Sequence, residues 1–302
     1  GPIDLIRASQ KESLGKAWGE RQHDGCLLFC EGPDVALADV LLRGRVPIIV
    51  FYEPPSRLAN EFVARLGMKM RDAVREASRY AAALAQFVGH EHFIFIDPRS
   101  MNSDTLAAKV ISLFNFTLSD ETVQNVVEAH NISTKSFPDH FEEARIQNAA
   151  DIAAADILNT FLTKFSKPAT PEALSTLTWP LTSFFTTSPP GTRYDGPVEL
   201  VGPARIIIYG PYLHLPRGDW SAAIEIELNE NHSGNLLVVD VCGGVNPGVF
   251  TLRAPPSGRF QIDAPFTVVD PLVPIELRVA IAEGAIEGQL WLRSVNFEAR
   301  TQ

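Results

Sequence analysis

The stretch Gly25-Cys-Leu-Leu-Phe-Cys-Glu-Gly-Pro-Asp-Val-Ala-Leu-Ala-Asp-Val-Leu-Leu42 gives the clearest indication of the fold. It begins with a short apolar run, Cys26 to Cys30, which predicts a strand buried on both faces. A turn follows at Glu31-Gly32-Pro33-Asp34, and apolar residues then recur at helical spacing. A strand, a glycine turn and a helix in this order can direct backbone N–H groups at a phosphate. The stretch therefore predicts an α/β domain with a candidate phosphate-binding turn.

Further strands and helices continue this pattern along the first half of the chain. Short apolar runs at Val46–Phe51 and His92–Ile96 predict two more strands. A helical pattern covers Leu58 to Val88, and Gly67 is a point where it bends or divides. Later helices are predicted at 103–114, 119–130 and 139–165. This alternation predicts a parallel-sheet α/β domain over residues 1–165.

Basic residues recur along the longest helical pattern. We interpret them as a solvated face, with a ligand site as the alternative. They are Arg65, Lys69, Arg71, Arg75 and Arg79.

Three segments of this half resemble the sulfotransferase family: Cys26–Leu42, Ile48–Asn60 and Phe93–Val127. In the family these segments are a strand with its glycine loop and helix, a strand followed by an Arg-Asp-Pro-x-x-Arg-x-x-Ser motif, and a structural strand, loop and helix. The resemblance implies a P-loop-like α/β sheet that binds phosphoadenosine phosphosulfate (PAPS).

The family's cofactor positions are mostly substituted in this chain. The resemblance assigns cofactor contacts to Gly32, Asp34, Tyr52, Arg57 and Asn60. Asp34 stands where the family has Lys or Arg, Tyr52 replaces an Arg, and Asn60 replaces a Ser. A carboxylate at a helix N-terminus would repel a phosphate, and each lost charge-assisted hydrogen bond is worth roughly 1.5–3 kcal/mol. We therefore expect a degenerate site without PAPS or another cofactor.

Carboxylates follow each predicted strand of the first half. Glu31, Glu53 and Asp97 fall at the carboxyl edge of the predicted sheet, where α/β proteins place their sites. They are candidate catalytic residues, because converging carboxylates can hold a divalent cation or act in acid–base chemistry. The alternative, which we favour, is that these residues cap helices and face water, with no metal bound.

The amino-acid composition of the chain changes at residue 166. A Pro-, Ser- and Thr-rich segment at 166–197 predicts a partly docked linker. Residues 198–302 contain short alternating runs, such as Ile224-Glu-Ile-Glu-Leu228, separated by turn residues. This pattern predicts a C-terminal antiparallel β-sandwich.

One segment of the predicted sandwich, Tyr209–Trp220, resembles a turn motif of β-sandwich modules attached to bacterial glycan-modifying enzymes. Tyr212, His214 and Trp220 are candidate ligand-binding residues, because flat apolar faces with polar edges suit a sugar. The alternative is that Tyr209 and Trp220 fill the sandwich core. Trp291 is interpreted as a core or interface residue.

Charge and hydropathy limit the possible partners. The 302 residues carry a formal net charge of −10, and no lysine follows Lys167, which argues against nucleic acid or an anionic membrane. Apolar runs fall short of the roughly 20 residues of a spanning helix, so no transmembrane segment is predicted. No signal peptide is visible, which predicts a cytoplasmic protein.

Two functions remain open from the sequence, and it does not decide whether the protein is an enzyme. The first is a binding protein for a saccharide or a protein partner, linked to surface polysaccharide biosynthesis or modification. The second is an active sulfo- or glycosyltransferase that acts on a saccharide with an altered donor or metal site. Oligomerisation is compatible with either.

Overall fold

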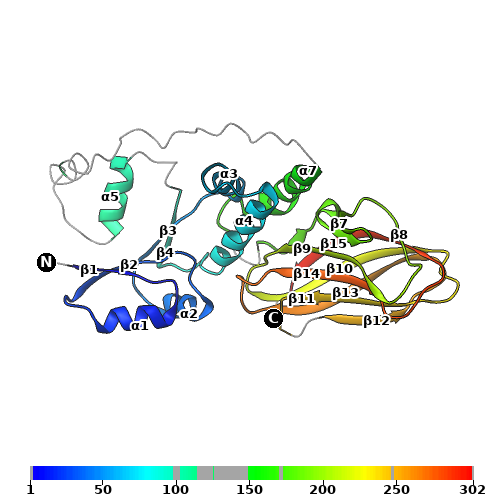
Figure 1. Cartoon of the computed structure of the whole chain (residues 1–302). Helices are drawn as coiled ribbons and strands as arrows, with labels where there is room; N and C mark the ends of the chain where they lie inside the picture. Colours follow the sequence, from blue (N-terminus) through cyan, green and yellow to red (C-terminus); the bar gives the residue numbers. More distant parts are fainter. Residues whose placement is uncertain are drawn as a thin grey trace. The chain divides into compact units, whose positions relative to one another are not determined.

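The computed structural model describes residues 3–97, 103–113, 125, 149–169, 173–245 and 248–300 (Figure 1). The chain forms two compact units. The N-terminal unit combines Gly1–Pro54 with Phe87–Arg145, and the sandwich unit combines Pro55–Gln86 with Ile146–Gln302. This division differs from the predicted boundaries after residues 165 and 197, because a segment of the first half belongs to the same unit as the C-terminal strands.

The N-terminal unit contains parallel strand pairs. Strand β1 (Ile3–Arg7) pairs with β2 (Gly25–Phe29), and β3 (Ile48–Phe51) pairs with β4 (Phe93–Ile96). They form two separate two-stranded sheets, so the single parallel sheet of a sulfotransferase-like core is not present among the described residues. Strand β1 was not predicted. The helices of this unit are α1 (Lys11–Gly19), α2 (Val35–Arg43) and α5 (Ser103–Leu113).

Two helices from the first half of the chain form part of the sandwich unit. Helix α3 (Pro55–Leu66) begins at a proline, whose fixed φ suits a first helical position, and it ends before Gly67, whose φ is +64°. Helix α4 (Met70–Ala85) follows, so the predicted division at Gly67 is confirmed. A stripe of small buried residues lets α4 pack closely against α3 and α7 (Ala149–Asp156). The stripe includes Ala73, Ala77, Ser78, Ala81 and Ala85.

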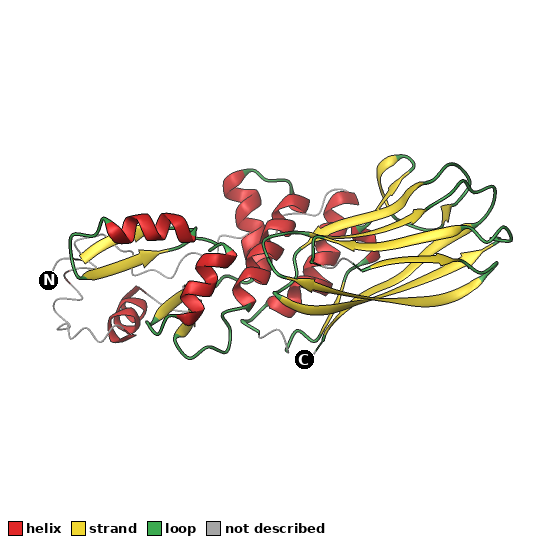
Figure 2. Cartoon of the chain, turned by 90° about the horizontal axis from the view of Figure 1, so that it is seen from below, coloured by secondary structure: helices red, strands yellow, loops and turns green. Residues whose placement is uncertain are grey.

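The predicted antiparallel sandwich is confirmed in the C-terminal part of the chain (Figure 2). A five-stranded sheet has the order β13-β10-β15-β5, with β8 also paired to β15. A six-stranded sheet has the order β12-β11-β14-β9-β6-β7. Its strands are β6 (Phe185–Thr187), β7 (Pro190–Arg193), β9 (Arg205–Leu213), β11 (Leu236–Cys242), β12 (Val249–Arg253) and β14 (Ile275–Ile281). The first sheet contains β5 (Thr176–Thr178), β8 (Val198–Glu199), β10 (Gly218–Asn229), β13 (Gly258–Val268) and β15 (Gln289–Ala299).

The segment predicted as a linker is integrated into this sandwich. Strand β5 pairs with β15, and β6 pairs with β9. Trp179 and Phe184 are about 1% and 0% exposed and belong to the main hydrophobic core. Residues 173–197 are therefore part of the folded unit, and their prolines interrupt strands without forming a tether.

Short irregular helices connect α7 to the sandwich. A π-helix, η2 (Ile157–Phe161), and a 3₁₀-helix, η3 (Leu162–Phe165), bury Phe161 and Leu162 in the same core. A second 3₁₀-helix, η4 (Leu181–Ser183), precedes β6. None of the helices that the structure describes has the length and apolar character needed to cross a membrane.

Candidate functional site

The glycine turn after β2 is closed by its own aspartate. Asp34 is the N-cap of α2, and its Oδ1 accepts a hydrogen bond of 2.7 Å from the Leu37 N–H. Gly32 has the positive φ of +57° that the turn requires. Burial, and then the nearby charges of Asp34 and Glu31, raise the pKa of the Cys30 thiol to about 11. The turn therefore carries negative charge, which disfavours binding of a phosphate.

The other positions expected from the sulfotransferase resemblance are divided between the units. Tyr52 follows β3 in the N-terminal unit, whereas Arg57 and Asn60 lie on α3 of the sandwich unit. Burial, and then the charge of Asp97, raise the pKa of Tyr52, so this side chain is a neutral phenol and cannot replace the family's arginine as a cation.

The candidate catalytic carboxylates do not form a metal site. Glu53 and Asp97 follow the paired strands β3 and β4, while Glu31 follows β2 in a different sheet. Within the described ranges no group of three or more His, Cys, Asp or Glu side chains could hold a metal ion. Among the described residues, these carboxylates therefore do not belong to a metal centre with three or more such ligands.

The predicted sugar platform is wrong for two of its three residues. Trp220 is about 1% exposed and donates its indole N–H to the Pro216 carbonyl at 2.9 Å. His214 is about 5% exposed and lies 3.1 Å from the hydroxyl of Ser78 on α4. Both fill the interior, as the core alternative for Trp220 predicted.

Tyr212, the third platform residue, lies at the partly exposed end of β9. Its φ of +67° is unusual for a bulky residue, and such conformations concentrate at binding sites. Its hydroxyl donates to Glu276 Oε1 at 2.6 Å. Burial and the Glu276 carboxylate raise the pKa of Tyr212 to about 12, so the phenol keeps its proton.

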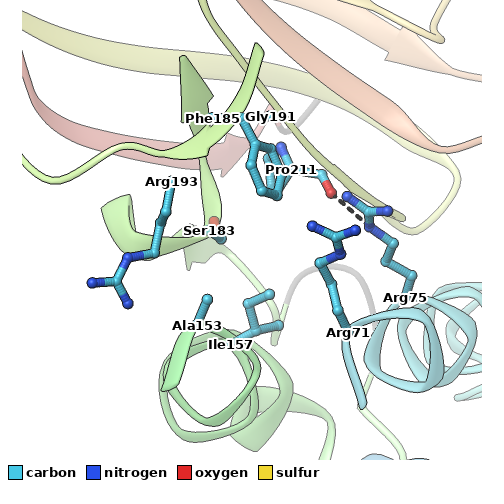
Figure 3. A pocket seen from close by; sticks show the side chains of 9 residues that line it. All are labelled: Arg71, Arg75, Ala153, Ile157, Ser183, Phe185, Gly191, Arg193 and Pro211. Carbon is cyan, nitrogen blue, oxygen red and sulfur yellow. Dashed lines mark hydrogen bonds between the residues drawn. The ribbon is translucent and has the colours of Figure 1, made fainter. Parts of the chain in front are cut away.

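A pocket of about 200 Å³ lies within the sandwich unit, and Pro211, the residue before Tyr212, is part of its lining (Figure 3). Arg71 and Arg75 extend into it from α4, and Ala153 and Ile157 come from α7 and η2. Arg193 lies on the opposite wall, with its guanidinium directed away from the other two (Figure 3). The remaining lining residues are Ser183, Phe185, Gly191 and Pro211.

The two arginines of α4 are held by different contacts. The Nε–H of Arg75 donates to the Pro211 carbonyl at 3.0 Å, and its guanidinium carbon lies 5.0 Å from the ring centre of Tyr212. The guanidinium carbon of Arg71 lies 5.2 Å from the ring centre of Phe185. Stacking on aromatic faces fixes both cations while their remaining N–H groups stay available.

The pocket concentrates positive charge that neighbouring carboxylates neutralise only in part. Asp72 Oδ1 lies 3.8 Å from a terminal guanidinium nitrogen of Arg75, whereas Arg71 forms no ion pair within the part of the chain that the structure describes. Burial lowers the pKa of Arg75, and the positive charge of Arg71 lowers it further. Arginine nevertheless stays protonated at neutral pH. Two adjacent cations at an open pocket are therefore arranged to receive an anionic group.

The sequence interpretation missed these arginines because it assigned all five basic residues to a solvated face. A distinguishing signal was present in the sequence. Arg79 and Arg65 have glutamates three and four residues before them, and they form ion pairs with Glu76 and Glu61. Arg71 has no acidic residue three or four positions away, and its neighbour at i+4 is Arg75.

Comparison with known proteins does not identify a family. No protein-family model and no curated protein matches this chain, so the sulfotransferase resemblance gains no support from them. The chain is weakly similar to the N-terminal cellulose-binding domain of a Cellulomonas fimi β-1,4-glucanase C, with 15% identity, 37% of this chain and 82% of that chain covered, and a TM-score of 0.19. It is also weakly similar to a pentameric capsid protein from metagenomic phage sequences, with 10% identity, 59% and 94% of the two chains covered, and a TM-score of 0.16. These TM-scores are too low to carry an argument about fold or function.

Proposed function

We propose that this protein binds an acidic saccharide, and that Arg71 and Arg75 hold a carboxylate, sulfate or phosphate group of that saccharide. The observation that carries the proposal is that two guanidinium groups from successive turns of α4 line one pocket, one of them with no ion pair among the described residues. In a chain with a net charge of −10, such a pair indicates a specific anion site and not a general attraction to polyanions.

The walls of the pocket favour a saccharide over a simple inorganic anion. Phe185, Pro211 and Ile157 supply apolar surface beside the cations, and Tyr212 lies against Arg75. Sugars combine apolar ring faces with polar edges, which fit a site of mixed aromatic and charged side chains. On this proposal the protein is a binding component in polysaccharide biosynthesis or modification, and a degenerate sulfotransferase-like origin of the N-terminal unit stays a prediction.

The proposal is tested on an array of neutral, uronate-containing and sulfated oligosaccharides, followed by titration calorimetry. The best acidic ligand is compared with its carboxyl-reduced or desulfated neutral form. Arg71→Gln should weaken binding of the acidic form about 10- to 100-fold, because a charge-assisted hydrogen bond is worth roughly 1.5–3 kcal/mol. Arg79→Gln is the matched control, since Arg79 lies on the same helix but pairs with Glu76 at 2.8 Å.

Two results would overturn the proposal. One is equal affinity for the acidic and neutral forms, with no effect of Arg71→Gln. The other is binding of a glutamate-rich peptide, dependent on Arg71, together with no binding to any acidic saccharide on the array. That second result would assign the pocket to a protein partner.

A further inference from the structure

The pocket continues into a row of outward side chains that crosses the six-stranded sheet. Directly opposite residues of neighbouring strands share a face of the sheet. Phe185, at the pocket, is opposite Tyr209, Tyr209 is opposite Arg278, and Arg278 is opposite Asp240. Arg193 is opposite Phe185 at one end of the row, and Val249 is opposite Asp240 at the other end. With strands about 4.8 Å apart, the row from β7 to β12 extends about 24 Å.

The middle of this row presents rings and fixed polar groups together. We call Tyr209, Tyr212, Glu276, Arg278 and Asp240 the cross-strand strip. The rings of Tyr209 and Tyr212 lie edge to face with centres 6.5 Å apart, and the rings of Phe185 and Tyr209 lie 5.7 Å apart. The strip is therefore continuous with the pocket through Phe185.

Hydrogen bonds hold the polar groups of the strip in place. Arg278 donates two hydrogen bonds to Asp240, at 2.9 and 2.6 Å, and Tyr212 donates to Glu276 at 2.6 Å. Side chains that are already ordered cost less conformational entropy on binding than mobile ones. All five residues are partly exposed, so a ligand can reach them.

The outer face of the five-stranded sheet has a different character. Its long side chains pair with one another, Arg259 with Glu225 and Arg293 with Glu227. The guanidinium carbon of Arg293 lies 5.5 Å from the ring centre of Trp291 and covers this ring. The six-stranded sheet also pairs its charges, Arg278 with Asp240, but beside the pocket it carries the neighbouring rings of Phe185, Tyr209 and Tyr212. This cluster of rings favours the six-stranded sheet as the binding surface.

We infer that the ligand is an extended acidic oligosaccharide or polysaccharide, which crosses the strands from the arginine pocket over Tyr209 to the Arg278–Asp240 pair. This inference rests on the proposed function and adds that several sugar units are bound at once. Charge complementarity at the arginines and continuity of the strip with the pocket support this occupant. The row of about 24 Å sets the length over which added sugar units gain contacts.

The test is a length series of one acidic oligosaccharide, from the disaccharide to the octasaccharide, titrated against the full chain. Affinity of the wild type should rise at least tenfold along the series and then level off. Tyr209→Ala, and the double substitution Asp240→Asn with Arg278→Gln, should remove this gain while leaving the affinity for the disaccharide unchanged. The double substitution avoids leaving a single unpaired charge, and circular dichroism checks the fold of each variant. Trp291→Ala is the control on the opposite face.

The outcomes separate this inference from the proposed function. Equal affinity for short and long acidic ligands, with binding still dependent on Arg71, overturns the inference and leaves the anion site standing. The inference is also overturned if the rise in affinity with ligand length remains in both strip variants but is lost in Trp291→Ala. Equal affinity of the wild type for the acidic disaccharide and its neutral form overturns the proposed function itself.

Discussion

Lowering the pH from about 7.5 to about 5 is expected to destabilise the sandwich unit through His214. This side chain is about 5% exposed, and its Nδ1 lies 3.1 Å from the Ser78 hydroxyl. Ser78 donates to the Arg75 carbonyl at 2.6 Å, so its oxygen is left to accept a hydrogen bond from the Nδ1–H of the neutral imidazole. Burial lowers the pKa of His214 from 6.5 to about 4, the charge of Glu76 opposes this shift, and that of Arg79 adds to it.

The sign and size of the effect follow from proton linkage. Because the folded-state pKa is the lower one, the unfolded chain binds a proton that the folded chain excludes. The stability is fully present above the unfolded value of 6.5, falls as the pH drops below it, and reaches its full loss below the folded value of about 4. The loss is about 2 kcal/mol near pH 5 and roughly 3 kcal/mol in full.

Urea unfolding of the wild type and of His214→Gln measures this loss. Tryptophan fluorescence follows mainly this unit, because Trp179, Trp220 and Trp291 belong to it, whereas Trp18 alone lies in the N-terminal unit. Both proteins share the titration of their carboxylates, so the difference between their free energies of unfolding isolates the histidine. That difference should shrink by about 2 kcal/mol between pH 7.5 and pH 5. A change below about 0.5 kcal/mol would refute the reasoning.

Two other substitutions test the described structure. Asp34→Ala should lower the stability of the N-terminal unit by about 1 kcal/mol, because the Leu37 N–H loses its side-chain acceptor. Addition of PAPS should leave the melting temperature of this variant unchanged. A rise in the melting temperature with PAPS would show that the turn binds phosphate. Tyr194→Phe should cost about 1–3 kcal/mol in urea unfolding, because the buried Tyr194 hydroxyl donates to the Leu292 carbonyl at 3.1 Å and accepts from the Leu292 N–H at 2.8 Å. An unchanged midpoint for Tyr194→Phe would mean that water replaces both bonds.

Local patterns predicted much of the secondary structure. The alternation at Ile224–Leu228 lies within β10, and the helix predicted at 103–114 agrees with α5 (Ser103–Leu113). Pairing was harder to predict, because it depends on contacts between distant segments. Strand β1 at Ile3–Arg7 was not predicted, because five residues carry too little periodicity to separate a strand from a helix. The predicted helix at 119–130 lies outside the described residues, except for residue 125.

The candidate site was predicted only in part. Tyr212 was singled out for its ring and lies beside the pocket, whereas Trp220 and His214 were singled out for the same reason and are buried. Composition alone does not distinguish an outward aromatic residue from an inward one before the strand register is known. Arg71 could be recognised as unusual because no acidic residue lies three or four positions from it, whereas Arg75 has Asp72 three positions before it. The pocket that both arginines line could not be predicted without knowing what α4 packs against.

The site depends on the discontinuous construction of the sandwich unit. Arg75 and Pro211, joined by a hydrogen bond, are 136 residues apart in the chain. Residues 198–302, which the sequence predicted as a complete domain, contain Tyr209, Tyr212 and the Arg278–Asp240 pair but neither α4 nor strand β6. Ser78, a small buried residue of α4, contacts His214 directly after β9, so the packing of this helix also positions Arg75 near Pro211. On the proposed function, a substitution in the buried face of α4 would therefore change both the stability of the unit and its affinity for the ligand.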